Sequence, residues 1–151
     1  MRSGGQDTGP LDRTRGKGAT MRVLLVDDHF LVRQALAALL AGEPDIEIIG
    51  EAGDGKVGVE MTRELRPDIV LMDLSMPVIN GVQATRAIHA THPDVCVIGL
   101  SMFDRDQQAE TMRDAGAMDY VTKSAAPEEL LTVMRGCYNR LREDLPPAAT
   151  G

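Results

Sequence analysis

Apolar and polar positions along the chain form two alternating kinds of segment, and this pattern predicts the secondary structure. Five short segments are rich in Val, Ile, Leu and Met, which predicts β-strands with little exposure on either face. Each is followed by a longer segment in which apolar residues recur every three or four positions, which predicts an amphipathic helix. The strands are expected at residues 21–26, 46–52, 69–72, 95–100 and 119–122, and the helices at residues 31–40, 55–65, 81–92, 107–115 and 128–141. Strands that alternate with helices predict an α/β fold, a doubly wound five-stranded parallel sheet covered by helices on both faces.

The two ends of the chain lack this pattern. Residues 1–20 contain five glycines and no apolar periodicity, so a flexible leader is expected there. Whether that leader is native, lies upstream of a true start at Met21, or is an expression remnant stays open. Residues 143–151 include a Pro-Pro pair and predict a disordered tail or the start of a linker. The folded domain is therefore expected to span residues 21–142.

Composition narrows the class of protein. Hydrophobic residues make up 43% and charged residues 26% of the chain, which is the balance of a globular domain. The net charge of −7 argues against direct binding of nucleic acid, which needs clustered Lys and Arg. Neither a membrane-spanning stretch nor a signal peptide is expected. Cys96 and Cys137 both lie in apolar patterns and are expected to be buried; two such cysteines suggest neither a disulfide framework nor a zinc site, which fits a cytoplasmic location.

Polar side chains follow the ends of four predicted strands. Asp27 and Asp28 follow the first strand, Asp73 the third, Ser101 the fourth and Lys123 the fifth. In a parallel sheet with right-handed crossovers, the carboxyl ends of the strands share one edge, and ligands bind there. We therefore expect three carboxylates, a hydroxyl and an ammonium group to converge at this edge.

These groups together predict phosphoryl-transfer chemistry. Clustered carboxylates repel one another unless a cation lies among them, and an oxygen-only site open to water suits Mg²⁺. A metal, Lys123 and the Ser101 hydroxyl around a carboxylate would neutralise and position a phosphoryl group during in-line attack. Asp73 is the expected nucleophile, and its phosphorylated form would be an aspartyl-phosphate.

Each of these residues alone has a simpler interpretation. Asp28 or Asp73 could cap the helix that follows it, Ser101 could be a turn residue, and Lys123 could be a solvated surface charge. Their joint occurrence at successive strand ends favours a site, because independent coincidences multiply.

Four segments of the sequence resemble the response-regulator receiver family. They are Leu25-Val26-Asp27-Asp28-His29, Met72-Asp73-Leu74-Ser75-Met76-Pro77 with Gly81, Gly99-Leu100-Ser101, and Gly116-Ala117-Met118-Asp119-Tyr120-Val121-Thr122-Lys123. The resemblance covers roughly residues 21–141, and the D-x-x-M-P-x-x-x-G pattern from Asp73 to Gly81 is highly specific. It implies a CheY-like, flavodoxin-like (βα)5 fold with strand order 2-1-3-4-5.

The resemblance also implies a function and a metal site. A receiver domain of a two-component system accepts a phosphoryl group from a sensor histidine kinase or a phosphotransfer protein, and it then controls an output domain or partner. Such a domain is not an enzyme in the usual sense, since it catalyses only its own phosphoryl transfer and slow self-dephosphorylation. By this resemblance, Asp27 and Asp28 hold Mg²⁺ directly or through water, Asp73 accepts the phosphoryl group and ligates the metal, and the backbone carbonyl of Ser75 is a further ligand.

The resemblance assigns the conformational switch as well. Lys123 pairs with the phosphoryl oxygens, Ser101 moves to hydrogen-bond them, and Tyr120 changes rotamer in concert. Two positions depart from the common pattern: Ser124 stands where many receivers have a proline, so a trans peptide bond is expected there, and Phe103 is a bulky apolar residue at a position that influences water access to the phosphoryl group.

The output of the switch stays open. Residues 28–33 resemble receivers of the NarL/FixJ type, which usually precede a DNA-binding domain, whereas residues 97–102 resemble receivers appended to hybrid sensor kinases. The parent protein is thus a transcription regulator, a hybrid kinase or a stand-alone receiver. The cognate kinase, the input signal and homodimerisation on phosphorylation are equally open.

Other classes of protein fit only parts of the sequence. Gly53-Asp54-Gly55-Lys56-Val57-Gly58 satisfies the G-x-G-x-x-G pattern, and Asp73 lies where a ribose-binding acid belongs, which would suit a dinucleotide-binding dehydrogenase. The motif follows the second strand, however, and leaves the other polar residues at the strand ends unexplained. These glycines are therefore expected to make the turn into the helix at residues 55–65. An aspartyl phosphatase is disfavoured because the first strand lacks a D-x-D motif, and a purely structural interaction domain because the site residues are intact. The histidines have no metal-ligand spacing and are expected on helix surfaces or caps.

Overall fold

A computed structural model describes residues 20–74, 76, 80–101 and 106–143 of the chain. The proposed leader and tail, apart from the residues next to the domain, lie outside this range. So do two residues that were assigned roles, Ser75 and Phe103.

Five strands alternate with five helices in the described part of the chain, as predicted. The strands are β1 (Met21–Val26), β2 (Ile46–Ala52), β3 (Ile69–Asp73), β4 (Cys96–Ser101) and β5 (Asp119–Thr122). The helices are α1 (Phe30–Ala41), α2 (Gly55–Leu65), α3 (Gly81–Thr91), α4 (Asp106–Ala115) and α5 (Pro127–Glu143). The predicted boundaries differ by one or two residues; β3 and β4, for example, each include the polar residue that follows the apolar run, because the ladder pairs Asp73 with Leu100 and Ser101 with Thr122.

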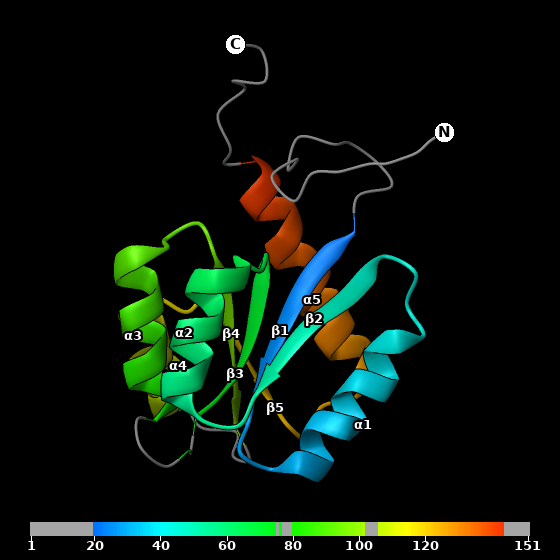
Figure 1. The fold of residues 1–151 in the computed structure, drawn as a ribbon, viewed down its shortest axis with the longest axis horizontal. Helices are drawn as coiled ribbons and strands as arrows, with labels where there is room; N and C mark the ends of the chain where they lie inside the picture. Colours follow the sequence, from blue (N-terminus) through cyan, green and yellow to red (C-terminus); the bar gives the residue numbers. More distant parts are fainter. Residues whose placement is uncertain (1–19, 75, 77–79, 102–105, 144–151) are drawn as a thin grey trace.

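The strands form one parallel sheet in the order β2-β1-β3-β4-β5, which confirms the predicted fold class and strand order. The chain first adds β2 on one side of β1 and then returns to add β3 on the other side (Figure 1). The order of the strands therefore reverses between β1 and β3, and in open α/β sheets ligands bind in the crevice beyond such a reversal. The ends of β1 and β3, where Asp27 and Asp73 lie, flank this point.

Helices cover both faces of the sheet, so each strand contributes side chains to two separate cores (Figure 1). Leu25 and Leu71 point toward the face covered by α1 and α5, whereas Leu24 and Val70 point toward the face covered by α2, α3 and α4. This division follows from the two-residue period of a strand. Cys96 and Cys137 are buried in the first core and are free, as expected.

The glycine-rich segment at the start of α2 has a structural explanation. A Cβ atom on Gly58 would lie 2.8 Å from Cγ1 of Val26, so glycine is needed where α2 packs closely on β1. The carboxylate of Asp54 caps the helix and accepts a hydrogen bond from the backbone N–H of Val57 at 2.8 Å, which places a negative charge where a pyrophosphate would bind. The motif also follows β2, an edge strand, rather than the reversal of strand order. These contacts favour a packing role over dinucleotide binding.

Candidate functional site

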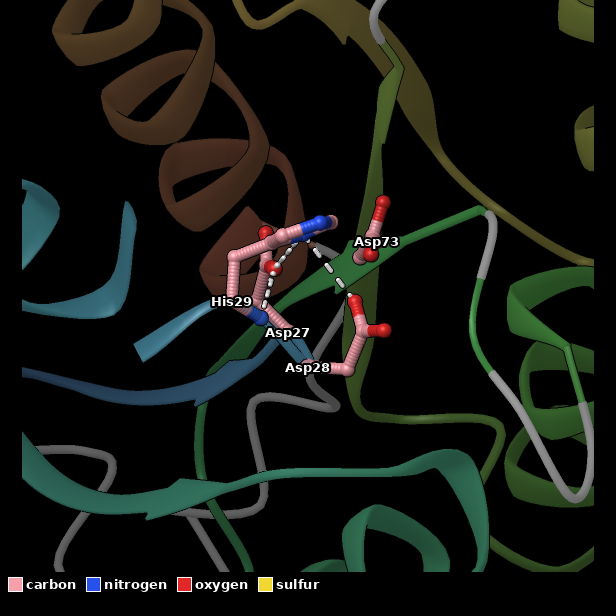
Figure 2. A group of neighbouring side chains, drawn as sticks. All are labelled: Asp27, Asp28, His29 and Asp73. Carbon is pink, nitrogen blue, oxygen red and sulfur yellow. Dashed lines mark hydrogen bonds and ion pairs between the residues drawn. The ribbon is translucent and has the colours of Figure 1, made fainter. Parts of the chain in front are cut away.

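Four polar side chains gather where β1 and β3 end. Asp27 and Asp28 directly follow β1, Asp73 is the last residue of β3, and His29 lies at the start of α1. One ligand atom from each of the four lies within 4.8 Å of the others (Figure 2). Asp27 and Asp73 are only 1% and 2% exposed, whereas Asp28 and His29 face solvent. The cluster is therefore anchored in the core and open to water on one side.

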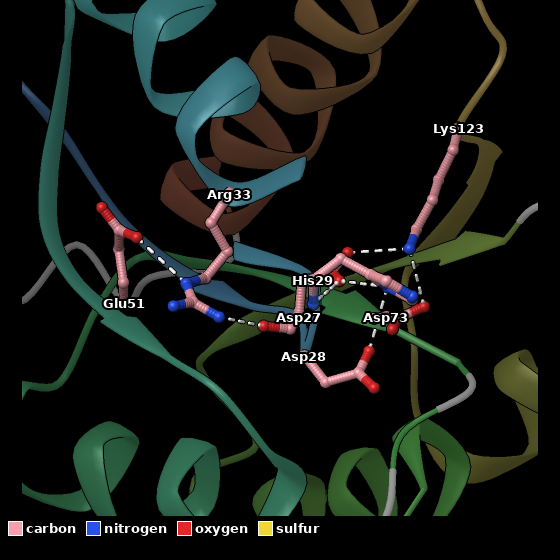
Figure 3. A network of polar contacts seen from close by, with 7 residues as sticks. All are labelled: Asp27, Asp28, His29, Arg33, Glu51, Asp73 and Lys123. Carbon is pink, nitrogen blue, oxygen red and sulfur yellow. Dashed lines mark hydrogen bonds and ion pairs between the residues drawn. The ribbon is translucent and has the colours of Figure 1, made fainter. Parts of the chain in front are cut away.

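Lys123 bridges the two buried carboxylates. Its Nζ lies 2.8 Å from Oδ2 of Asp27 and 3.0 Å from Oδ1 of Asp73 (Figure 3). The backbone N–H of Lys123 donates to the carbonyl of Ser101 at 2.6 Å, which ties the start of the side chain to the end of β4. Burial acts to lower the pKa of Lys123, but hydrogen bonds and charge attraction from Asp27 and Asp73 outweigh it and raise that pKa above its ordinary value.

His29 also belongs to this cluster, although its spacing in the sequence gives no sign of it. Its Nδ1 lies 3.2 Å from Oδ1 of Asp27 and 3.1 Å from Oδ1 of Asp28 (Figure 2). The prediction that the histidines occupy helix surfaces or caps is correct for His29, which is the N-cap residue of α1. The sequence gives the histidines no metal-ligand spacing, and the structure adds only that the ring of His29 lies beside the acids, because the chain turns tightly between Asp27 and His29. The direct succession of Asp27, Asp28 and His29 in the sequence was the one feature that could have placed His29 near the acids.

The position of His29 also removes one simpler interpretation of Asp28. His29 rather than Asp28 is the N-cap of α1, and no side-chain capping bond is made there. Asp27 instead accepts a hydrogen bond from the backbone N–H of His29 at 2.8 Å, which turns the chain sharply after β1. This turn leaves the Asp28 carboxylate within the cluster, instead of at the helix end.

The chain after β3 returns closely to Asp73. Leu74 donates its backbone N–H to the carbonyl of Leu100, and Gly81 donates to the carbonyl of Leu74, both at 3.0 Å. A Cβ atom on Gly81 would overlap the carbonyl oxygen of Asp73, so only glycine fits. Asn80 then starts α3 with a reciprocal capping box to Gln83. The start of α3 is therefore held close against the backbone of Asp73 and Leu74.

The two residues assigned to the switch lie on the neighbouring strands. Ser101 is buried at the end of β4, one residue beyond the partner of Asp73 in the ladder. Tyr120 of β5 is half-buried, pairs with Gly99, and packs against the core beneath α2, α3 and α4. The Lys123–Ser124 peptide bond is trans as expected, since the described residues contain no cis peptide bond.

The donor set fits a small divalent cation. Three carboxylates face one ammonium group in the cluster, so negative charge remains in excess at the sheet edge. Carboxylate oxygens that are partly open to water are the ligands that Mg²⁺ prefers. Asp27, Asp28 and Asp73 are therefore the residues that would hold such an ion.

Comparisons with known proteins agree with the fold. The profile of the response regulator receiver domain matches residues 23–135. The chain is 44% identical over 115 residues to the transcriptional regulatory protein LiaR of Bacillus subtilis, which is 76% of this chain and 54% of that protein. A solved two-component response regulator of the LuxR family from Aurantimonas superposes with a TM-score of 0.77 at 35% identity, covering 80% of this chain and 86% of that one. The response regulator domain of Thermotoga maritima CheB gives 0.75 at 32% identity, covering 80% and 97%.

The chain therefore belongs to the response regulator receiver family of two-component signalling systems. Members of this family act with sensor kinases and are signalling proteins rather than conventional enzymes. The chain spans about half the length of the curated relatives that it matches. Within the described residues, no helix is long and apolar enough to span a membrane.

Proposed function

We propose that this domain accepts a phosphoryl group on Asp73, in a Mg²⁺-dependent reaction, from a sensor histidine kinase or a phosphotransfer protein. The observation that carries the proposal is the ion pair of Lys123 with both Asp27 and Asp73 inside an acidic cluster. A buried lysine held against a carboxylate is costly to maintain for stability alone. Such a lysine is useful where a negatively charged phosphoryl group must be bound.

The reaction needs a nucleophile and neutralisation of charge. A carboxylate oxygen of Asp73 attacks the phosphorus atom while the bond from phosphorus to the donor's leaving group breaks, which leaves an acyl phosphate. The Lys123 ammonium group, 3.0 Å from Asp73, is in place to neutralise a phosphoryl oxygen. Mg²⁺, when bound, supplies further neutralisation and orientation of the phosphoryl group.

Asp27 and Asp28 hold the metal in this proposal, directly or through water, with Asp73 and the backbone carbonyl of Ser75 as further ligands. Burial of Asp27 and its contact with Lys123 support a fixed position for one carboxylate, whereas the exposure of Asp28 suits a ligand that acts through water. Phosphorylation would then draw the Ser101 hydroxyl inward and allow Tyr120 to change rotamer, reshaping the face formed by α4, β5 and α5.

The domain would control an output that lies elsewhere in a longer cytoplasmic protein or in a partner. The name of LiaR, a transcriptional regulatory protein, favours a DNA-binding output over a hybrid kinase or a stand-alone receiver. The acidic domain itself would bind neither DNA nor membrane, and homodimerisation on phosphorylation is one way to transmit the signal.

Incubation with acetyl phosphate and Mg²⁺, followed by intact mass measurement, tests the proposal. We expect one added phosphoryl group, and none when Mg²⁺ is chelated. Asp73→Asn should abolish the addition. Asp68→Asn is the matched control, because Asp68 is also buried and lies beside the opposite end of β3; it should be labelled like the wild type. Equal labelling of Asp73→Asn would place the nucleophile elsewhere.

A further inference from the structure

One cation near the acidic cluster takes no part in the proposed chemistry. Arg33, on the first turn of α1, donates a hydrogen bond from Nη1 to the backbone carbonyl of Asp27 at 2.6 Å. Its Nε donates to Oε1 of Glu51 on β2 at 3.1 Å, and its guanidinium carbon lies 5.6 Å from the centre of the Phe30 ring. The side chain is only 16% exposed. Figure 3 shows Arg33 beside the cluster, reaching the Asp27 carbonyl from α1.

These contacts join three elements at the residue where the acidic cluster begins. The carbonyl of Asp27 belongs to the peptide unit that links Asp27 to Asp28, so the bond from Arg33 fixes the orientation of that unit. A hydrogen bond from a charged donor is shorter and stronger than a neutral one, and Glu51 holds the planar guanidinium in place from the other side. The relative directions of the two carboxylates follow from this peptide unit.

We infer that Arg33 is a positioning residue, which holds the Asp27–Asp28 peptide so that both carboxylates face Asp73 for a divalent cation. This inference rests on the proposed function. Groups that orient metal ligands from behind commonly change metal affinity by roughly ten- to a hundredfold when they are removed.

The sign of the effect separates positioning from charge. A cation close to a metal site repels the metal, so loss of the Arg33 charge alone would strengthen binding of Mg²⁺. Loss of the bond to the Asp27 carbonyl would weaken it. The two roles therefore predict opposite changes in the dissociation constant.

Arg22 offers a matched control with the same chemistry at the other end of β1. Its guanidinium donates to the backbone carbonyls of Arg66 at 2.7 Å and Leu65 at 2.9 Å. Removing it also deletes bonds from a guanidinium to backbone carbonyls, but it touches no residue of the acidic cluster. Any general loss of stability should thus appear in both variants.

The test is a titration of the full chain with Mg²⁺, in which NMR chemical shifts report binding. The melting temperature of each variant is measured as well. We expect Arg33→Met to raise the Mg²⁺ dissociation constant by roughly tenfold, while Arg22→Met leaves it within about twofold despite a comparable fall in melting temperature. Arg33→Gln, which keeps polarity but is too short to reach the carbonyl, should behave like Arg33→Met and serves if the latter does not fold. Glu51→Gln keeps the bond to Asp27 and should also stay within about twofold.

Unchanged or tighter binding in the folded Arg33 variants would overturn the inference. So would equal weakening in Arg22→Met, or a tenfold loss in Glu51→Gln, since the carbonyl bond would then not be the cause. A wild-type chain that binds no Mg²⁺ would instead overturn the proposed function, and this inference with it.

Discussion

Lys123 sits between two carboxylates that have almost no contact with water. Asp27 and Asp73 are buried, and the Lys123 ammonium is within 3.0 Å of both. Removing one partner of a buried ion pair costs far more than the pair contributes, because it leaves an uncompensated charge in the core. The unphosphorylated domain therefore depends on Lys123 to compensate the charge of the two buried carboxylates.

We predict that Lys123→Met lowers the free energy of unfolding at pH 7 by about 3 kcal/mol and that added Mg²⁺ recovers part of this loss. The raised pKa of Lys123 means that its stabilisation is complete below the ordinary lysine pKa and is lost only as pH rises through the higher folded value. The difference from the wild type should therefore stay constant between pH 7 and 9. Urea unfolding measures it; a difference that disappears across that range would contradict the ion-pair account.

Residues close in sequence to a strand end could be placed from the sequence, and residues that arrive from elsewhere could not. Asp27, Asp73 and Lys123 were assigned to one edge because parallel strands end together. His29 was missed because its ring reaches back to the acids through a tight turn. Arg33 was noted only within a resemblance, since its contacts with the Asp27 carbonyl and with Glu51 require the packing of α1 against β2.

At the scale of elements, α5 is joined to the loop between α1 and β2 by a compact ionic contact. Arg135 of α5 binds Asp45 through Nε at 2.9 Å and Nη2 at 2.8 Å, and Glu43 through Nη2 at 2.7 Å. The hydrogen bonds from Arg135 are the main reason that the pKa of Asp45 lies below its ordinary value of 3.8. Arg135 and Asp45 lie far apart in the sequence. Their contact was therefore not predicted, although the helix that carries Arg135 was.

We predict that Arg135→Gln reduces the free energy of unfolding at pH 7 by about 0.5–1 kcal/mol, a small value because solvent screens these half-exposed groups. The depressed pKa of Asp45 means that the stabilisation is present above pH 3.8 and is lost as pH falls through the lower folded value. The difference between variant and wild type should thus close in acid. Arg86→Gln, on the exposed side of α3, is the control, and thermal unfolding from pH 7 down to pH 3 is the measurement. A difference in stability between variant and wild type that stays constant over this pH range would contradict the prediction.

At the scale of the molecule, the alternation of strands and helices determined the fold class, whereas the strand order came from the resemblance. Periodicity predicts which segments form strands, but it does not predict on which side of β1 each later strand is added. The observed order β2-β1-β3-β4-β5 places the reversal between the strands that carry Asp27 and Asp73. It also leaves the glycine-rich segment after an edge strand, away from the reversal of strand order where a nucleotide would bind.

This arrangement predicts selectivity between ligands. Mg²⁺ should raise the melting temperature in a saturable way, because a ligand that binds only the folded state stabilises it by mass action. NAD should produce no saturable shift, since Asp54 occupies the start of α2 and Gly58 is required for packing against Val26. A thermal-shift titration with each ligand is sufficient. A saturable rise with NAD would revive the dehydrogenase hypothesis.

Chemical identification of the phosphorylated residue tests the central claim most directly. An acyl phosphate is reduced by borohydride to an alcohol, so protein treated with acetyl phosphate and Mg²⁺ and then reduced should yield peptides with homoserine at position 73. The account predicts this product at Asp73 alone, at wild-type levels in Asp68→Asn and not at all without Mg²⁺. Reduction at Asp27 or Asp28, or no reduced residue in a protein that has gained the phosphoryl mass, would contradict it.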